Sequence, residues 1–272
     1  CGMKALRTVF MSLVMLLLYA PIFVMIVFSF NSAKSTSIFK GFSVRWYKEL
    51  FLYNSNLIDA LKNTLLLAVI SAVIATVLGT VAAVGIAKMR KKWLKSAVMT
   101  ATNIPMMNPD VVTGISMMLM FVSVGKLLSL TSSVNFFTIL IAHITFSLPY
   151  VILNVMPKLK TADEHLIEAA EDLGCSPVAA FFKVVLPSIM PGIVIGFIMA
   201  FTMSLDDFVI SYFTNGTFQT LPLVIYSMAK KPLKPDVYAL ESIMFIAILL
   251  LMIVLNIVQN RSDKSERSIR SK

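Results

Sequence analysis

The chain has 272 residues, of which 58% are hydrophobic and only 14% are charged, and its formal net charge is +10. Soluble domains contain about one quarter charged residues, so this composition excludes an ordinary soluble enzyme, and its hydrophobicity excludes a disordered chain. A nucleic-acid partner is not expected either, because a phosphate-binding surface needs more charge than this. We therefore expect an integral membrane protein embedded in a lipid bilayer.

Six apolar segments are long enough to cross a bilayer, which takes about 20 helical residues. In chain order they cover approximately residues 8–30, 64–87, 96–125, 136–157, 188–213 and 239–259. The third contains two prolines and Asp110, and the fifth includes Asp206 and Asp207. The sequence thus predicts an all-α, polytopic membrane protein with a single transmembrane domain over 1–260 and a basic tail at 261–272.

Basic residues indicate the orientation of these segments, because lysine and arginine are retained on the cytoplasmic side of a membrane. The tightest basic cluster, at 88–95, follows the second segment, and further basic residues follow the sixth. The N-terminus, the loop at 158–187 and the C-terminal tail then share one side. Both termini are therefore expected to face the cytoplasm.

Two segments carry small residues at four-residue intervals, a pattern that lets helix backbones approach closely in a membrane. These residues are Ser71, Ala75, Gly79, Ala83 and Ala87 in the second segment and Gly192, Gly196, Ala200 and Ser204 in the fifth. Packing between helices of this chain is expected rather than a contact between subunits. The segments should therefore form a packed bundle.

The cytoplasmic loop at 158–187 is expected to begin with an acidic helix. Thr161 and Glu164 have the spacing of a capping box, which starts the helix near residue 162. Gly174 should end it, because glycine readily adopts the left-handed conformation at a helix terminus. The acidic residues of this helix are Asp163, Glu164, Glu168, Glu171 and Asp172. Docking of a soluble partner explains an ordered acidic helix here better than a solvated surface does.

A second helix should follow in the same loop. Ser176 is suited to cap its N-terminus, and Pro177 is suited to its first position. Pro187 is expected to end it. The loop would then consist of two short helices joined by a tight turn at Gly174.

The loop also contains a recognisable pattern. Glu168-Ala169-Ala170, then Gly174, then Val184-x-Leu186-Pro187 resembles the EAA loop of ABC-importer permeases, with every spacing matched and valine in place of the usual isoleucine. The resemblance implies the type I permease fold with six transmembrane helices. It also implies that the loop couples the permease to a cytoplasmic ATPase. The coupling residues would be Glu168, Ala169, Ala170, Gly174, Leu186 and Pro187.

Further strings extend the resemblance to most of the chain. They are FSFNSAK at 28–34, GFSVRWY at 41–47, NPDVVTGIS at 108–116, AHITFSLPY at 142–150 and MSLDDFVISYF at 203–213. They resemble the C-type permease of spermidine/putrescine ABC importers in the bacterial inner membrane. This implies four partners: a second permease forming a heterodimer, two ATPase subunits and an extracytoplasmic polyamine-binding protein. ATP and Mg would be bound by the ATPases, and no cofactor by this chain.

Three acids lie within or beside apolar segments, where a carboxylate is costly and is usually functional or paired. Asp206, Asp207 and Asp110 could stabilise the ammonium groups of a polycation on its pathway. Phe208 and Tyr212 lie close in sequence to the aspartate pair and could add cation–π contacts. Alternatively, one aspartate of the pair caps a helix near the interface, and Asp110 favours a helix N-terminus.

Other chemistry finds little support in the sequence. No phosphate-binding G-x-x-x-x-G-K-[ST] pattern occurs, so ATP should be hydrolysed by another subunit. Cys1 and Cys175 suggest neither a disulfide framework nor a metal site, and no catalytic constellation indicates an enzyme. His143 is expected to pack through hydrogen bonds rather than to relay protons. Two alternatives remain open: a related importer of sulfate, iron or another small solute, and an ion-coupled secondary transporter.

Overall fold

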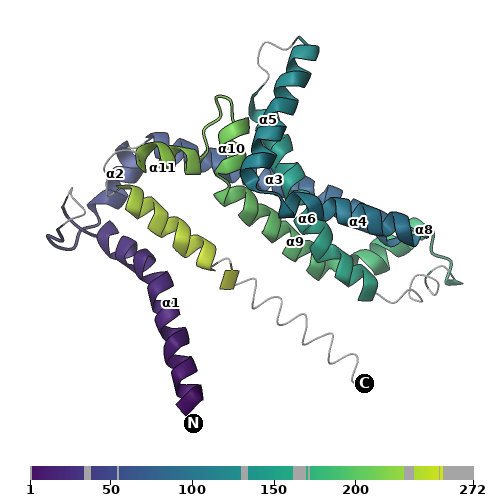
Figure 1. The fold of residues 1–272 in the computed structure, drawn as a ribbon, viewed down its shortest axis with the longest axis horizontal. Helices are drawn as coiled ribbons and strands as arrows, with labels where there is room; N and C mark the ends of the chain where they lie inside the picture. The colour runs from purple at the N-terminus through teal and green to yellow at the C-terminus, as the bar shows by residue number, and fades with distance from the viewer. Residues whose placement is uncertain are drawn as a thin grey trace. The chain divides into compact units, whose positions relative to one another are not determined.

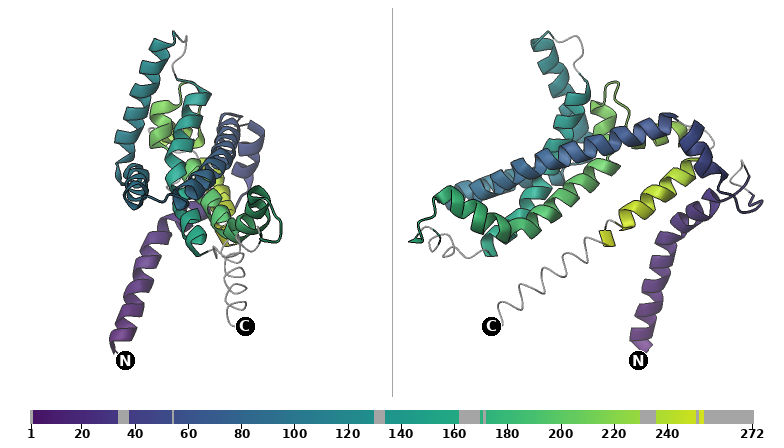
Figure 2. Two further views of the ribbon diagram at one scale, coloured as in Figure 1. Left: turned by 90° about the vertical axis from the view of Figure 1, so that its right-hand side faces the viewer. Right: turned by 180° about the vertical axis from the view of Figure 1, so that it is seen from behind.

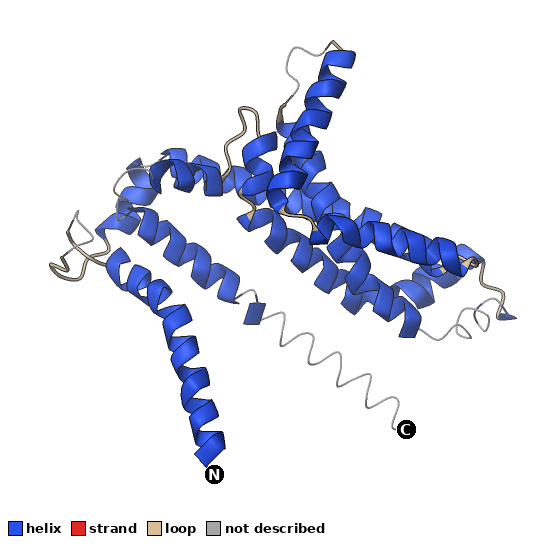
Figure 3. Cartoon of the chain, in the orientation of Figure 1, coloured by secondary structure: helices blue, strands red, loops and turns tan. Residues whose placement is uncertain are grey.

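The computed structural model describes most of the chain as helices joined by loops (Figure 3). The described residues are 2–33, 38–53, 55–129, 134–161, 170, 172–229, 236–250 and 252–253. Among them there is no strand, only an isolated bridge between Asn31 and Phe42. The expectation of an all-α chain is thereby confirmed over these residues.

Five helices of the described residues are long and apolar enough to cross a membrane. They are Leu6–Ser29, Ser55–Ala87, Asp110–Leu127, Phe136–Thr161 and Pro177–Asp206. The sixth expected segment, at about 239–259, lies partly outside the described residues, and 236–250 and 252–253 are helical. The helical structure of these apolar segments is confirmed, and the count of six spans stays a prediction.

The chain divides into two compact units, Cys1–Asp59 with Ile225–Lys272, and Ala60–Val224. The first contains α1 (Gly2–Ser29) and α2 (Arg45–Tyr53) (Figure 1). Trp46 joins the start of α2 to the residues that follow α1. Trp46 is 5% exposed, and its indole N–H donates to the Asn31 carbonyl. Nearby, the hydroxyls of Ser29 and Tyr47 are 2.8 Å apart. These contacts fix the turn that follows the first span.

The second unit contains most of the remaining helices (Figures 1 and 2). In chain order they are α3 (Ser55–Ala87), α4 (Lys92–Met107), α5 (Asp110–Leu127), α6 (Phe136–Thr161), α8 (Pro177–Ala180), the π-helical η1 (Phe181–Val185), α9 (Leu186–Asp206), α10 (Val209–Thr214) and α11 (Leu221–Ala229). The first turn of α3 and the end of α11 belong to the other unit. Within the second unit, α6 packs along α9.

The small-residue stripes of α3 and α9 both face α6. A Cβ on Gly192 would lie 2.8 Å from the Asn154 carbonyl oxygen, and one on Gly79 would lie 2.7 Å from the Val151 side chain. At Gly196 the nearest neighbour, again in Val151, would be 3.2 Å away. The two stripes also meet, because the Ser71 hydroxyl donates to Ser204 over 2.9 Å. The prediction that the stripes pack within the chain is confirmed.

This close packing leads to a stability prediction. We expect Gly192→Ala to destabilise the protein by about 1–3 kcal/mol, because the added methyl group would overlap the Asn154 carbonyl. That carbonyl belongs to the backbone of α6 and cannot move without distorting the helix. Gly85→Ala is the matched control, since nothing lies within 4 Å of the added Cβ and alanine favours a helix. Thermal unfolding in detergent should show a lowered midpoint for Gly192→Ala alone. Equal midpoints in the two variants would contradict the packing described.

Two expected spans differ from the helices that form. The segment at 96–125 divides into α4 and α5 at Asn108 and Pro109, because proline has no N–H and keeps the preceding residue extended. Asn108 has ψ 143°. The segment at 188–213 is interrupted at Asp207, whose ψ of 120° ends α9 before α10 begins. Both interruptions place an aspartate beside a helix terminus.

Candidate functional site

The break between α9 and α10 separates the two neighbouring aspartates. The Asp207 carboxylate accepts the N–H of Ile210 over 3.2 Å and that of Ser211 over 2.7 Å, so it closes the first turn of α10. Its side chain is only 7% exposed, whereas Asp206 is exposed. The break therefore directs one carboxylate into the bundle and the other away from it.

Helix α5 brings the third acid, Asp110, towards this break. A Cβ on Gly114 would lie 2.8 Å from the Phe213 ring and 3.5 Å from Ile210 Cα, so α5 packs directly on α10. Asp110 is one helical turn before Gly114, about 6 Å along the axis. Its side chain is exposed. Acids that are far apart in the sequence are thus gathered around α10.

Aromatic side chains accompany these acids. The rings of Phe208 and Tyr212 have centroids 5.7 Å apart, and Tyr212 is 54% exposed. On α6, the rings of Phe146 and Tyr150 are 5.8 Å apart. Carboxylates and aromatic rings are both groups that bind organic cations. Within the described residues, no three metal-ligating side chains are grouped so as to hold a metal ion.

His143 of α6 lies on the buried side of the break between α9 and α10 and is 2% exposed. Its Nδ1 is 2.7 Å from the Ser204 hydroxyl and its Nε2 is 3.0 Å from the Ser211 hydroxyl. The expected hydrogen-bonded packing of His143 is confirmed. The sequence did not reveal that the Asp207 carboxylate lies 3.5 Å from Nε2, because no local spacing relates these two residues.

The turn of the cytoplasmic loop forms as predicted. Gly174 has φ +84°, in the left-handed region, and the Cys175 N–H donates to the Ala170 carbonyl over 3.0 Å. Ser176 then caps the next helix by accepting the Ala179 N–H over 3.3 Å, and Pro177 occupies its first turn. The predicted stop and restart are both confirmed.

The start of the loop is only partly described. Thr161 is the last residue of α6, and its hydroxyl donates towards the carbonyls of Pro157 and Lys158. Glu164, Glu168 and Ala169 lie outside the described residues, so the capping box and these two coupling residues stay predictions. No contact of Ala170, Gly174, Leu186 or Pro187 tests their coupling role.

The predicted end of the second loop helix at Pro187 is wrong. The helix runs without interruption from Pro177 to Asp206, with Pro187 in the first turn of α9. Proline has no N–H to donate, and the wider π-helical turn just before it accommodates the missing bond. In that turn the Leu186 N–H donates to the Phe181 carbonyl. The loop is thus continuous with the span that ends at the aspartates.

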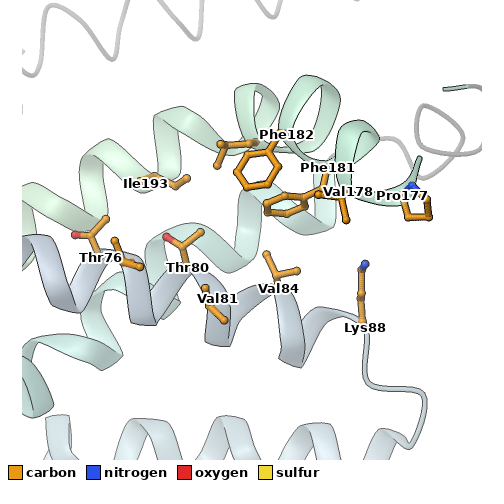
Figure 4. A pocket seen from close by; sticks show the side chains of 12 residues that line it. Thr76, Thr80, Val81, Val84, Lys88, Pro177, Val178, Phe181, Phe182 and Ile193 are labelled. Atoms are coloured by element: carbon orange, nitrogen blue, oxygen red, sulfur yellow. The ribbon is translucent and has the colours of Figure 1, made fainter. Parts of the chain in front are cut away.

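A groove separates α3 from the return arm, which we define as residues 177–193 (Figure 4). The groove has a volume of about 700 Å³ and is lined mainly by apolar side chains, including Val84 and Phe181. Thr80 also lines it, and its buried hydroxyl has no hydrogen-bond partner among the described residues. Part of the return arm is therefore separated from α3 by open space.

Known proteins resemble this chain along most of its length. The sequence model of the family described as binding-protein-dependent transport system inner membrane component matches residues 75–267. The chain is 37% identical to the spermidine/putrescine transport system permease protein PotC of Escherichia coli (strain K12), over 96% of each protein. It is 34% identical to the putrescine transport system permease protein PotI of the same strain, over 89% of this chain and 86% of that protein.

A solved structure shares the fold. The crystal structure of a bacterial ABC transporter involved in the import of the acidic polysaccharide alginate matches with a TM-score of 0.70 and 15% identity, over 95% of each chain. At this identity the likeness shows the fold alone. The family model and the full-length relatives show more: the chain belongs to the family of binding-protein-dependent transport system inner membrane components and is a multi-pass inner-membrane protein.

Proposed function

We propose that this chain is the permease subunit of an ATP-driven importer of polyamines, spermidine and putrescine. The observation that supports this most is the 37% identity to a spermidine/putrescine permease over 96% of both proteins. The surface around α10 agrees with such a cargo, because exposed carboxylates and aromatic rings suit ammonium groups that have lost part of their water. The chain itself would bind no cofactor and hydrolyse no ATP.

In this proposal the acids around α10 line the substrate pathway in different ways. Asp206 and Asp110 are exposed and would contact ammonium groups directly. Phe208 and Tyr212 would add cation–π contacts worth about 0.5–2 kcal/mol each. Asp207 would not contact the substrate directly, because its oxygens already accept the N–H groups of the first turn of α10.

The coupling loop would transmit the work of the ATPases to this pathway. Glu168, Ala169, Ala170, Gly174, Leu186 and Pro187 would form the part that docks on an ATPase. From Pro177 to Asp206 the chain is one continuous helix, so about 45 Å of helix joins the loop to the pathway acid. A tilt of the return arm into the groove beside α3 would move Asp206. The π-helical turn at Phe181–Val185 supplies a place for this motion to begin.

The remaining features of the proposal concern topology and partners. Residues 1–260 would form one six-span permease domain with both termini in the cytoplasm, followed by the basic tail at 261–272. A second permease would complete the pathway, two ATPase subunits would bind ATP and Mg, and an extracytoplasmic binding protein would deliver the polyamine.

Uptake of labelled spermidine by vesicles containing the complete complex tests this function. Unlabelled putrescine and spermidine should compete with the labelled substrate, because they present the same ammonium groups to the acids around α10. Sulfate and ferric iron should not compete. If sulfate or iron competes and the polyamines do not, that solute is the cargo and not a polyamine. The assignment as an ABC-importer permease would still stand.

A further inference from the structure

The break between α9 and α10 is held by one side chain from a third helix. His143 of α6 contacts Ser204, which lies in α9 before the break, and Ser211, which lies in α10 after it. The two oxygens are 2.7 Å and 3.0 Å from opposite nitrogens of the ring. A single imidazole therefore bridges both sides of the break.

The same ring approaches the residue at which the helix breaks. Its Nε2 is 3.5 Å from Asp207 Oδ2, the oxygen that also accepts the Ser211 N–H. The Asp207 side chain is 7% exposed and that of His143 is 2% exposed, so water cannot readily replace either partner. The ring and the carboxylate together fix where α9 stops and how α10 starts.

A fourth helix completes the arrangement. Ser71 of α3 donates to the Ser204 hydroxyl over 2.9 Å. Each ring nitrogen of His143 thus meets one serine hydroxyl, and Nε2 also faces Asp207. Four helices contribute to this chain of bonds within the apolar part of the protein. An apolar side chain could fill the same volume without requiring any of these polar partners.

The contacts of His143 also affect the exposed residues on either side of the break. Asp206 is the last residue of α9 and is exposed, and Tyr212 of α10 is 54% exposed. A break without fixed ends would let α10 rotate about the extended backbone at Asp207. We propose that His143 is a positioning residue of the transport pathway, holding the α9–α10 break so that Asp206 and Tyr212 face the substrate. This inference rests on the proposed role of Asp206 in binding polyamines.

Kinetics of spermidine uptake by the complete complex test the inference. His143→Leu should raise the spermidine concentration for half-maximal uptake by about tenfold and change the maximal rate less. The reason is that Asp206 would no longer be held in the orientation that binds substrate. Uptake is normalised to the amount of assembled complex, because His143→Leu leaves Ser204, Ser211 and Asp207 without their imidazole partner and should lower the yield. His143→Gln should restore most of the affinity, because its amide can reach the position of Nε2 and donate towards Ser211 and Asp207.

Ser147→Ala is the matched control. Ser147 lies one turn further along α6, is fully buried, and its hydroxyl has no hydrogen-bond partner among the described residues. Its removal should leave the uptake kinetics unchanged. Ser211→Ala removes only the α10 partner of the ring and should also raise the half-maximal concentration. It keeps the inference testable if His143→Leu fails to assemble.

A double-variant cycle separates positioning from a general structural effect. In an Asp206→Asn background, His143→Leu should raise the half-maximal concentration less than it does alone, because the charged group that it positions is already lost and only Tyr212 remains. Fully additive effects, or unchanged half-maximal concentrations in both His143→Leu and Ser211→Ala, would overturn the inference. If Asp206→Asn alone leaves uptake unchanged, the proposed role of Asp206 fails instead. The two failures are therefore distinguishable.

Discussion

Replacing Asp206 with asparagine is expected to raise the spermidine concentration for half-maximal uptake by about ten- to a hundredfold. The carboxylate is exposed at the end of α9, and a hydrogen bond to a charged group is worth about 1.5–3 kcal/mol, with about 1.4 kcal/mol per factor of ten. The neutral amide keeps the size of the side chain and loses the attraction for an ammonium group. Initial rates of uptake over a range of spermidine concentrations measure the change.

Two further substitutions sharpen this experiment. Asp206→Glu keeps the charge and should retain most of the affinity. Asp207→Ala should act differently, because it removes the acceptor for the Ile210 and Ser211 N–H groups and leaves His143 without a neighbouring carboxylate. Its main effect should be a lower yield of folded complex. Normal half-maximal concentrations in Asp206→Asn would remove that residue from the pathway.

Replacing Gly174 with valine is expected to abolish ATP-dependent uptake and the co-purification of the ATPase. Gly174 has φ +84°, a conformation that costs a non-glycine residue about 1–2 kcal/mol and a β-branched one more. No described residue lies within 4 Å of a Cβ added there, so the expected effect comes from the backbone conformation. A turn forced out of the left-handed region would misdirect the helix that begins at Pro177.

Asparagine at the same position provides the control. It tolerates the left-handed conformation better than other non-glycine residues, so Gly174→Asn should retain more ATPase than Gly174→Val does. Immunoblots of the ATPase that co-purifies with each variant give the comparison. Equal retention in both variants would mean that the left-handed turn is not required for docking.

Local features of the coupling loop could be predicted because they depend on neighbouring residues. A positive φ at Gly174 and a cap at Ser176 follow from the conformational freedom of glycine and from the reach of a serine hydroxyl. The small-residue stripes were predictable for a similar reason, since a four-residue interval places side chains on one face of a helix. Pro187 was misjudged because the compensating π-helical turn has no comparable signature in the sequence.

Long-range contacts at the candidate pathway could not be predicted. The aspartates were recognised as unusual, but their different surroundings follow from a backbone break at Asp207 and from the placement of α6 behind it. Nothing near His143 in the sequence indicates Ser204, Ser211 or Asp207 as its partners. The approach of α5 to α10 depends on the absence of a side chain at Gly114, which the sequence alone does not relate to Phe213.

The energy source of spermidine uptake tests the central claim most directly. Vesicles containing the complete complex should accumulate labelled spermidine when ATP is supplied on the ATPase side. Accumulation should continue when ionophores collapse all ion gradients, because the work would reach Asp206 through the loop and α9 rather than through an ion. Accumulation that stops with the ion gradients and persists without ATP would contradict the account.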